Sequence, residues 1–145
     1  MIDRTNPENV YTPAGNAYTQ VIGTNADRMV HVAGTVPENE SSELVGVGDM
    51  DAQIEQVMQN ISRSLAAEGC DLSDVVRIRI FTTDMDAYMR AQRTVGSYFS
   101  DGECPTSTLV GVDRLADSFH GIAPGEPTDI EPRYLVEVDA TAVTE

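Results

Sequence analysis

The stretch that decides the fold runs from Asp71 to Asp86 and reads Asp-Leu-Ser-Asp-Val-Val-Arg-Ile-Arg-Ile-Phe-Thr-Thr-Asp-Met-Asp. Because successive side chains of a β-strand point to opposite faces, this pattern predicts a strand with one apolar and one mixed face. The apolar face consists of Val76, Ile78 and Ile80. The mixed face consists of Val75, Arg77, Arg79 and Phe81. This second face is too apolar for plain solvent surface and too charged for ordinary core, so we expect it to meet another subunit or a ligand.

Both neighbours of this strand have the period of amphipathic helices. The helix before it is expected to begin after Asp49 as N-cap and to end at Gly69. Its apolar stripe is Met50, Ile54, Val57, Met58, Ile61 and Leu65. The helix after the strand is expected to be capped by Asp84. Its stripe is Tyr88, Ala91, Val95, Tyr98 and Phe99. Both helices are predicted to cover the apolar face of one sheet.

Four further segments have the composition of strands, and they are 18–24, 28–36, 106–112 and 134–143. The first two are expected to form a hairpin. Residues 1–16 are predicted to be an irregular N-terminal arm, and 113–132 a long loop that serves as a lid or a mobile connection. The predicted order ββαβαββ gives one α+β domain over residues 1–145, with two helices on one face of a mixed sheet. A sheet covered on one face only, with apolar residues on the other, predicts an oligomer.

Acidic residues dominate the charge of the chain, with 24 Asp and Glu against 9 basic residues, all of them arginine, and a net charge of −15. Such a surface repels itself unless salt screens it, so we expect a halophilic protein from a salt-adapted cytoplasm. The same charge argues against nucleic acid as a partner. No apolar run approaches the ~20 residues of a membrane span and no leader pattern is present, which predicts a soluble cytoplasmic protein without membrane contact.

The cysteine and histidine pattern offers no metal site. Cys70 and Cys104 form neither a CxxC nor a Cys/His ligand pattern, so we expect free thiols and neither metal nor cofactor. His31 alternates with apolar residues on a predicted strand and is interpreted as structural. His120 lies in the long loop, where it is expected to be exposed unless the loop closes over a cleft.

Several short motifs, in this order and spacing, resemble the Rid (reactive intermediate deaminase) family, also called YjgF or L-PSP endoribonuclease. They are Val32-Ala33-Gly34-Thr35-Val36-Pro37, Glu68-Gly69, Leu72-Ser73-Asp74-Val75-Val76, Phe81-Thr82-Thr83-Asp84-Met85, Tyr98-Phe99, Pro105-Thr106-Ser107-Thr108 and Val136-Glu137-Val138-Asp139-Ala140. The resemblance spans about Tyr18 to Val143. It implies a chorismate-mutase-like fold, a homotrimer with inward-facing sheets, and small-molecule clefts between subunits.

In the deaminase branch of this family, an arginine binds the substrate carboxylate and an acid on the last strand positions the water that hydrolyses an imine. By the resemblance, Asp139 matches the acid and Tyr18 matches an aromatic residue that lines the cleft. Ser107 stands at the arginine position, so this chain departs from the deaminase pattern there.

Two hypotheses for function follow. In the first, the cleft hydrolyses an imine, with Asp139 as the base that positions the water and with Tyr18 and backbone groups near Gly34 as the wall. Another arginine binds the anion in this hypothesis, and the candidates are Arg77, Arg79 and Arg133. The plainer interpretation of Arg79 is a structural ion pair to Glu137 or Asp139. In the second, the trimer binds an uncharged or cationic metabolite without deaminating it, through Ser107, Thr108 and Asp139. RNA cleavage, a third possibility, conflicts with the negative net charge of the chain. The chain also lacks the pair of histidine and lysine side chains that such a reaction would use.

Overall fold

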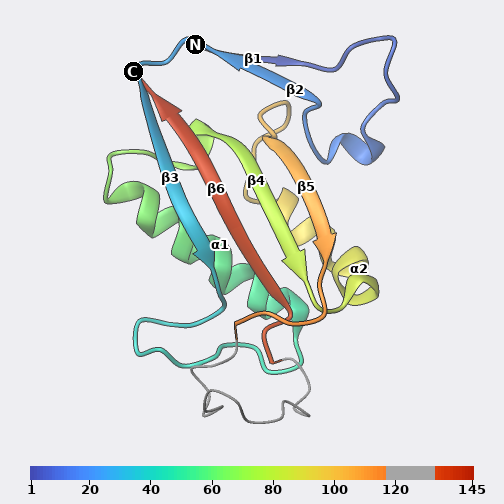
Figure 1. The fold of residues 1–145 in the computed structure, drawn as a ribbon, viewed down its shortest axis with the longest axis vertical. Helices are drawn as coiled ribbons and strands as arrows, with labels where there is room; N and C mark the ends of the chain where they lie inside the picture. The colour runs from blue at the N-terminus through green and yellow to red at the C-terminus, as the bar shows by residue number, and fades with distance from the viewer. Residues whose placement is uncertain (117–132) are drawn as a thin grey trace.

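The computed structural model describes residues 1–116 and 133–145. Its main sheet has four strands in the order β3 (Arg28–Thr35), β6 (Val136–Thr144), β4 (Val75–Thr82) and β5 (Thr106–Gly111). β6 runs antiparallel to both β3 and β4, whereas β5 runs parallel to β4, so the sheet is mixed as predicted (Figure 1). β5 is therefore an edge strand. The predicted lid within 113–132 lies, from residue 117 onward, outside the described residues.

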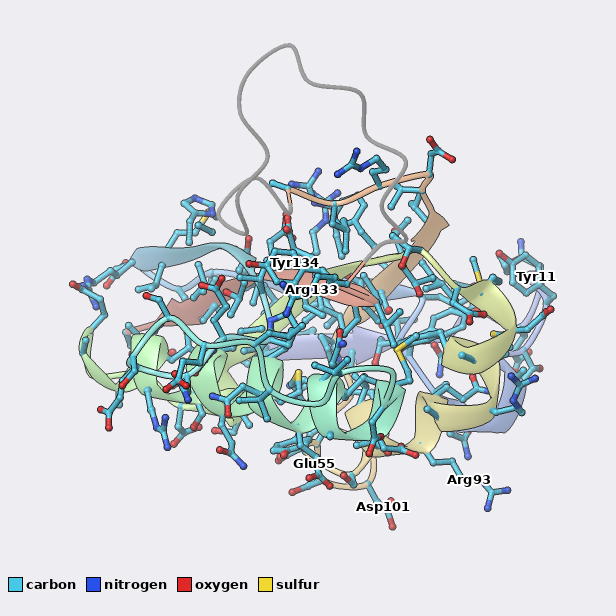
Figure 2. All side chains as sticks on the ribbon, turned by 90° about the horizontal axis from the view of Figure 1, so that it is seen from below. Tyr11, Glu55, Arg93, Asp101, Arg133 and Tyr134 are labelled. Atoms are coloured by element: carbon cyan, nitrogen blue, oxygen red, sulfur yellow. The ribbon has the colours of Figure 1, made fainter. Side chains whose placement is uncertain are left out.

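Two helices, α1 (Met50–Ala66) and α2 (Met85–Gly96), lie on the same face of this sheet (Figure 2). Both predicted N-caps are confirmed, because a carboxylate oxygen of Asp49 accepts from the Ala52 N–H at 3.1 Å and one of Asp84 accepts from the Ala87 N–H at 3.0 Å. The core between helices and sheet includes the predicted stripe of α1 and the inward side chains of β6. None of the helices among the described residues combines the length and apolar character needed to cross a membrane.

The start of β4 corrects one prediction. Val75 was expected on the mixed face, but its side chain is fully buried in the core. The reason is a register shift: Val75 lies opposite Ala142 and Arg77 opposite Thr141, so Val76 is an extra residue in a β-bulge. A bulge resets the alternation of side chains. From Arg77 onward the predicted alternation holds.

The N-terminal arm is more ordered than predicted. Residues Ile2–Thr5 form strand β1, which pairs antiparallel with β2 (Val21–Thr24) in a separate two-stranded sheet. The predicted hairpin between 18–24 and 28–36 is therefore wrong, because β2 pairs with β1, while β3 pairs with β6. Thr19, which follows the arm, is hydrogen-bonded to the segment just before β5. Its N–H donates to the Pro105 carbonyl at 3.0 Å, and its hydroxyl donates to the Cys104 carbonyl at 2.5 Å.

Candidate functional site

One group of predicted site residues lines a groove between α2, β5 and residues 14–18. It is a cavity of about 470 Å³, with Tyr18, Ser107 and Thr108 among polar lining residues and Met89 and Phe99 among apolar ones. We call this cavity the α2 groove. Its size lies within the range of small-molecule sites, and its mostly apolar wall with a few hydroxyl groups is typical of them.

The register of the parallel strands explains why Ser107 lies in the α2 groove. Ser107 is the neighbour of Ile78, which is buried under the helices, whereas Thr108 is the neighbour of Arg79 on the opposite face. Ser107 therefore points to the helical side of the sheet. Thr108 is also among the residues that line the groove, although its side chain belongs to the opposite face of the sheet.

The other predicted site residues lie on the opposite face, which we call the open face. No described helix covers it. Here Arg79 forms an ion pair with Asp139. The Nε atom of Arg79 donates to Oδ1 of Asp139 at 3.1 Å and to Oδ2 at 2.9 Å, and its Nη2 atom donates to Oδ2 at 2.5 Å. The guanidinium also lies over the Phe81 ring, 5.9 Å from its centroid. The hydrogen bonds from Arg79 to Asp139, helped by the negative charge of Asp139, raise the pKa of Arg79.

This geometry confirms the plainer interpretation of Arg79, a structural ion pair with Asp139. The guanidinium of Arg79 therefore already donates hydrogen bonds to a carboxylate of its own chain. A carboxylate has about four lone-pair positions, so Asp139 retains acceptor capacity for a water molecule. Its side chain is 20% exposed, which leaves that capacity accessible from the open face.

Glu137 is a second acid on the open face, two residues before Asp139 on β6. Burial raises the pKa of Glu137, and the negative charge of Asp139 adds to the effect. Its carboxylate fills the space next to Gly34, where a Cβ atom would collide with it. Two neighbouring carboxyl groups in different environments are suited to different proton-transfer roles. From the sequence alone, Glu137 is predicted only as an ion-pair partner, because strand alternation indicates the face of a side chain but not how deeply it is buried.

Replacing Glu137 by Gln is expected to raise the free energy of unfolding, and to raise it more at pH 8 than at pH 5. The folded carboxyl has a pKa above its ordinary value of 4.5. The stability that it contributes is therefore present below pH 4.5 and is lost as the pH rises through the folded pKa. Glutamine cannot ionise and avoids this loss. Urea denaturation at both pH values measures the difference, with the exposed Glu103→Gln as the control. A gain that is larger at pH 5 would contradict this explanation.

The remaining candidates among residues 1–116 and 133–145 have ordinary structural surroundings. His31 Nδ1 lies 3.3 Å from the Thr141 hydroxyl across the β3–β6 ladder, and His120 is outside the described residues. Both cysteines are free thiols, as predicted, and burial raises the pKa of Cys104. In residues 1–116 and 133–145, no group of three or more His, Cys, Asp or Glu side chains is arranged to hold a metal ion.

The fold and these two groups of residues define a class: an α+β protein with both helices on one sheet face, an open second face and a groove at the edge strand. The family model described as Endoribonuclease L-PSP matches residues 10–120 of the chain. The protein belongs to this family.

Relatives and solved structures agree with that assignment. Protein DfrA of Myxococcus xanthus is 37% identical over 88% of this chain and 85% of its own. The 3-aminoacrylate deaminase RutC of Acinetobacter baylyi is 32% identical over 77% of this chain and 94% of its own. The crystal structure of the Rid-family protein YyfB from Yersinia pestis, whose function is unknown, has a TM-score of 0.79 at 29% identity and covers 98% of both chains.

Proposed function

We propose that this protein is a homotrimer that hydrolyses small imine or enamine metabolites in clefts between its subunits. One observation carries the proposal: the predicted site residues fall on opposite faces of the sheet. Tyr18 and Ser107 line the α2 groove, whereas Gly34 lies against Glu137 and Asp139 pairs with Arg79 on the open face. A single chain thus holds two half sites that face in different directions.

An assembly with rotational symmetry can bring the α2 groove of one subunit against the open face of the next. In a ring of identical subunits, each interface brings one surface of a subunit against a different surface of its neighbour. The groove at edge strand β5 and the open face are two such surfaces. The open face also carries apolar side chains that are far from buried in the single chain, with Met29 58% exposed and Val110 39% exposed. Covering these side chains favours association.

The chemistry that this cleft supports is the addition of water to a C=N bond. Asp139 accepts a hydrogen bond from the water and takes its proton as the oxygen attacks the imine carbon. The imine nitrogen takes one proton from solvent as the water adds, which gives a neutral carbinolamine. A second proton on nitrogen then turns it into the leaving group, the C–N bond breaks, and ammonia leaves while the hydroxyl group and Asp139 each return a proton to solvent, so that a carbonyl compound remains. Glu137 is the second acid on this face, and burial raises its pKa, which makes it the better suited of the two acids to supply the second proton to nitrogen.

The relative from Acinetobacter baylyi supports this choice of reaction, because it is named a 3-aminoacrylate deaminase and 3-aminoacrylate is an enamine. The ion pair favours a second candidate function. With Arg79 held by Asp139 and Ser107 at the position of the carboxylate-binding arginine, a trimer that binds a neutral metabolite without deaminating it is the alternative.

A trapping assay tests the reaction. An amino-acid oxidase that tolerates molar KCl generates 2-iminopropanoate, and semicarbazide captures whatever imine remains. We expect the purified protein to lower the rate of semicarbazone formation from the imine, and Asp139→Asn to abolish this effect. A folded wild-type trimer without any effect on trapping would rule out imino-acid hydrolysis and favour the binding function.

A further inference from the structure

Strand β3 contains a β-bulge at the point where it passes Asp139 of β6. The register between the two strands shifts between Val32 and Thr35, so that residues 33 and 34 both lie opposite Asp139. The Thr35 hydroxyl donates to the Ala33 carbonyl at 2.9 Å, a hydrogen bond that spans the bulge. Bulges redirect side chains and are common beside active sites. The second residue of this bulge is a glycine, Gly34.

Gly34 lies against the carboxyl group of Glu137. A Cβ atom at position 34 would be 3.0 Å from the carboxyl carbon of Glu137 and closer still to its Oε2 atom. The backbone of Gly34 does not have a positive φ, so the approach of Glu137, and not the backbone conformation, is what requires glycine here. The collision would involve the end of a flexible side chain. An added methyl group is therefore expected to displace the carboxyl group and to leave the strand intact.

We propose that Gly34 is a positioning residue, which leaves room for the Glu137 carboxyl group beside Asp139, where this group donates a proton to the substrate nitrogen. The inference rests on the proposed hydrolysis and deepens it, because it assigns the placement of the proton donor to one residue of β3. A shift of about 1 Å in a catalytic group can cost about 10²-fold in rate, so a single methyl group at position 34 is enough to matter.

The surroundings of Glu137 favour a carboxyl group that keeps its proton. Its side chain is half-buried, and burial is the main cause of its raised pKa, to which the negative charge of Asp139 adds. The residue opposite Glu137 on β4 is the uncharged Phe81, and Arg79 on the same strand is paired with Asp139. On the β3 side, Gly34 adds no charge. Displacing the carboxyl group from this position would remove both causes of the raised pKa in part.

Carbon-13 NMR of the glutamate carboxyl groups tests the placement without any assay of hydrolysis. The Glu137 resonance is the one that Glu137→Gln removes. We expect its titration midpoint in wild type to lie above the ordinary value of 4.5, and in Gly34→Ala to shift down toward that value. Gly23→Ala on β2 is the matched control and should leave the midpoint unchanged, since nothing lies within 4 Å of a Cβ atom there. An unchanged midpoint in Gly34→Ala would overturn the proposal, whatever the protein hydrolyses.

The kinetics of the trapping assay test whether Gly34 acts through Glu137. Gly34→Ala is expected to lower kcat by about tenfold to a hundredfold with KM nearly unchanged. In a Glu137→Gln background the same change should have little further effect, because the carboxyl group that it displaces is already gone. An equal loss in that background would contradict the role of Gly34. A wild type without imine hydrolysis would refute the proposed function and this catalytic role with it, and the NMR titration distinguishes that failure from a wrong placement.

A stability measurement covers the case in which Gly34→Ala folds poorly. Adding Glu137→Ala removes the side chain that the new methyl group would meet. The double variant should therefore melt at about the same temperature as Glu137→Ala alone. If it melts far below Glu137→Ala, the backbone of β3 and not Glu137 requires the glycine, and the proposal is wrong.

Discussion

Two inactive variants, Tyr18→Ala and Asp139→Asn, are expected to regain activity when their subunits are mixed within one trimer. Tyr18 lies in the α2 groove and Asp139 on the open face, so each variant damages a different half of every cleft. If a cleft joins the groove of one subunit to the open face of the next, random mixing in equal amounts leaves about one quarter of the clefts with both halves intact. The mixture should then show about one quarter of wild-type activity.

The contrast with the unmixed variants is large, because removing a general base typically lowers the rate by about 10²–10⁴-fold. The subunits are exchanged by joint unfolding and refolding, and native mass spectrometry verifies that mixed trimers have formed. Mixing Asp139→Asn with Asp139→Ala is the control, since no cleft in that mixture has an intact acid. Mixed trimers that remain as inactive as their parents would contradict the division of the site between subunits.

Replacing Gln53 by Leu is expected to lower the free energy of unfolding by about 2 kcal/mol or more, since each buried polar group left without its partner costs about 1–3 kcal/mol. Two groups lose their partner, because the Gly46 carbonyl keeps a hydrogen bond from the Asp49 N–H. Gln53 is fully buried on α1. Its Nε2 donates to the carbonyls of Gly46 and Arg133, both at 2.9 Å, and its Oε1 accepts from the Leu135 N–H at 2.7 Å. The side chain therefore joins α1 to the loop before it and to the segment that leads into β6.

Leucine has a similar volume but satisfies none of these three groups. Urea denaturation at a fixed protein concentration measures the loss, because assembly makes stability depend on concentration. Gln56→Leu on the same helix is the matched control. Its amide donates to Asn60 Oδ1 at 2.9 Å in a half-buried position, so we expect a loss below about 1 kcal/mol. Equal losses for the two variants would show that the buried hydrogen bonds of Gln53 do not hold these segments together.

The helices were predictable because their signals are local. The Asp49 and Asp84 caps and the spacing of apolar residues are all contained in the segments that form α1 and α2. The strands show the limit of this reasoning. Whether β2 pairs with β1 or with β3 depends on segments distant in sequence, and the β-bulge that buries Val75 is defined only against β6.

The candidate site likewise has some features that local patterns predict and others that depend on contacts between distant segments. Alternation along β4 and β6 placed Arg79 and Asp139 on one face, and their ion pair is observed. The position of Ser107 required the register between β4 and β5, which no pattern within either strand reveals.

In the proposed function, the α2 groove of one subunit and the open face of the next form a complete site only where the two subunits meet. Light scattering on the purified protein in molar KCl tests it most directly, combined with the trapping assay on the same sample. We predict a molar mass three times the 15.7 kDa of the single chain, with imine hydrolysis confined to that species. A monomer of 15.7 kDa that hydrolyses the imine would contradict the account.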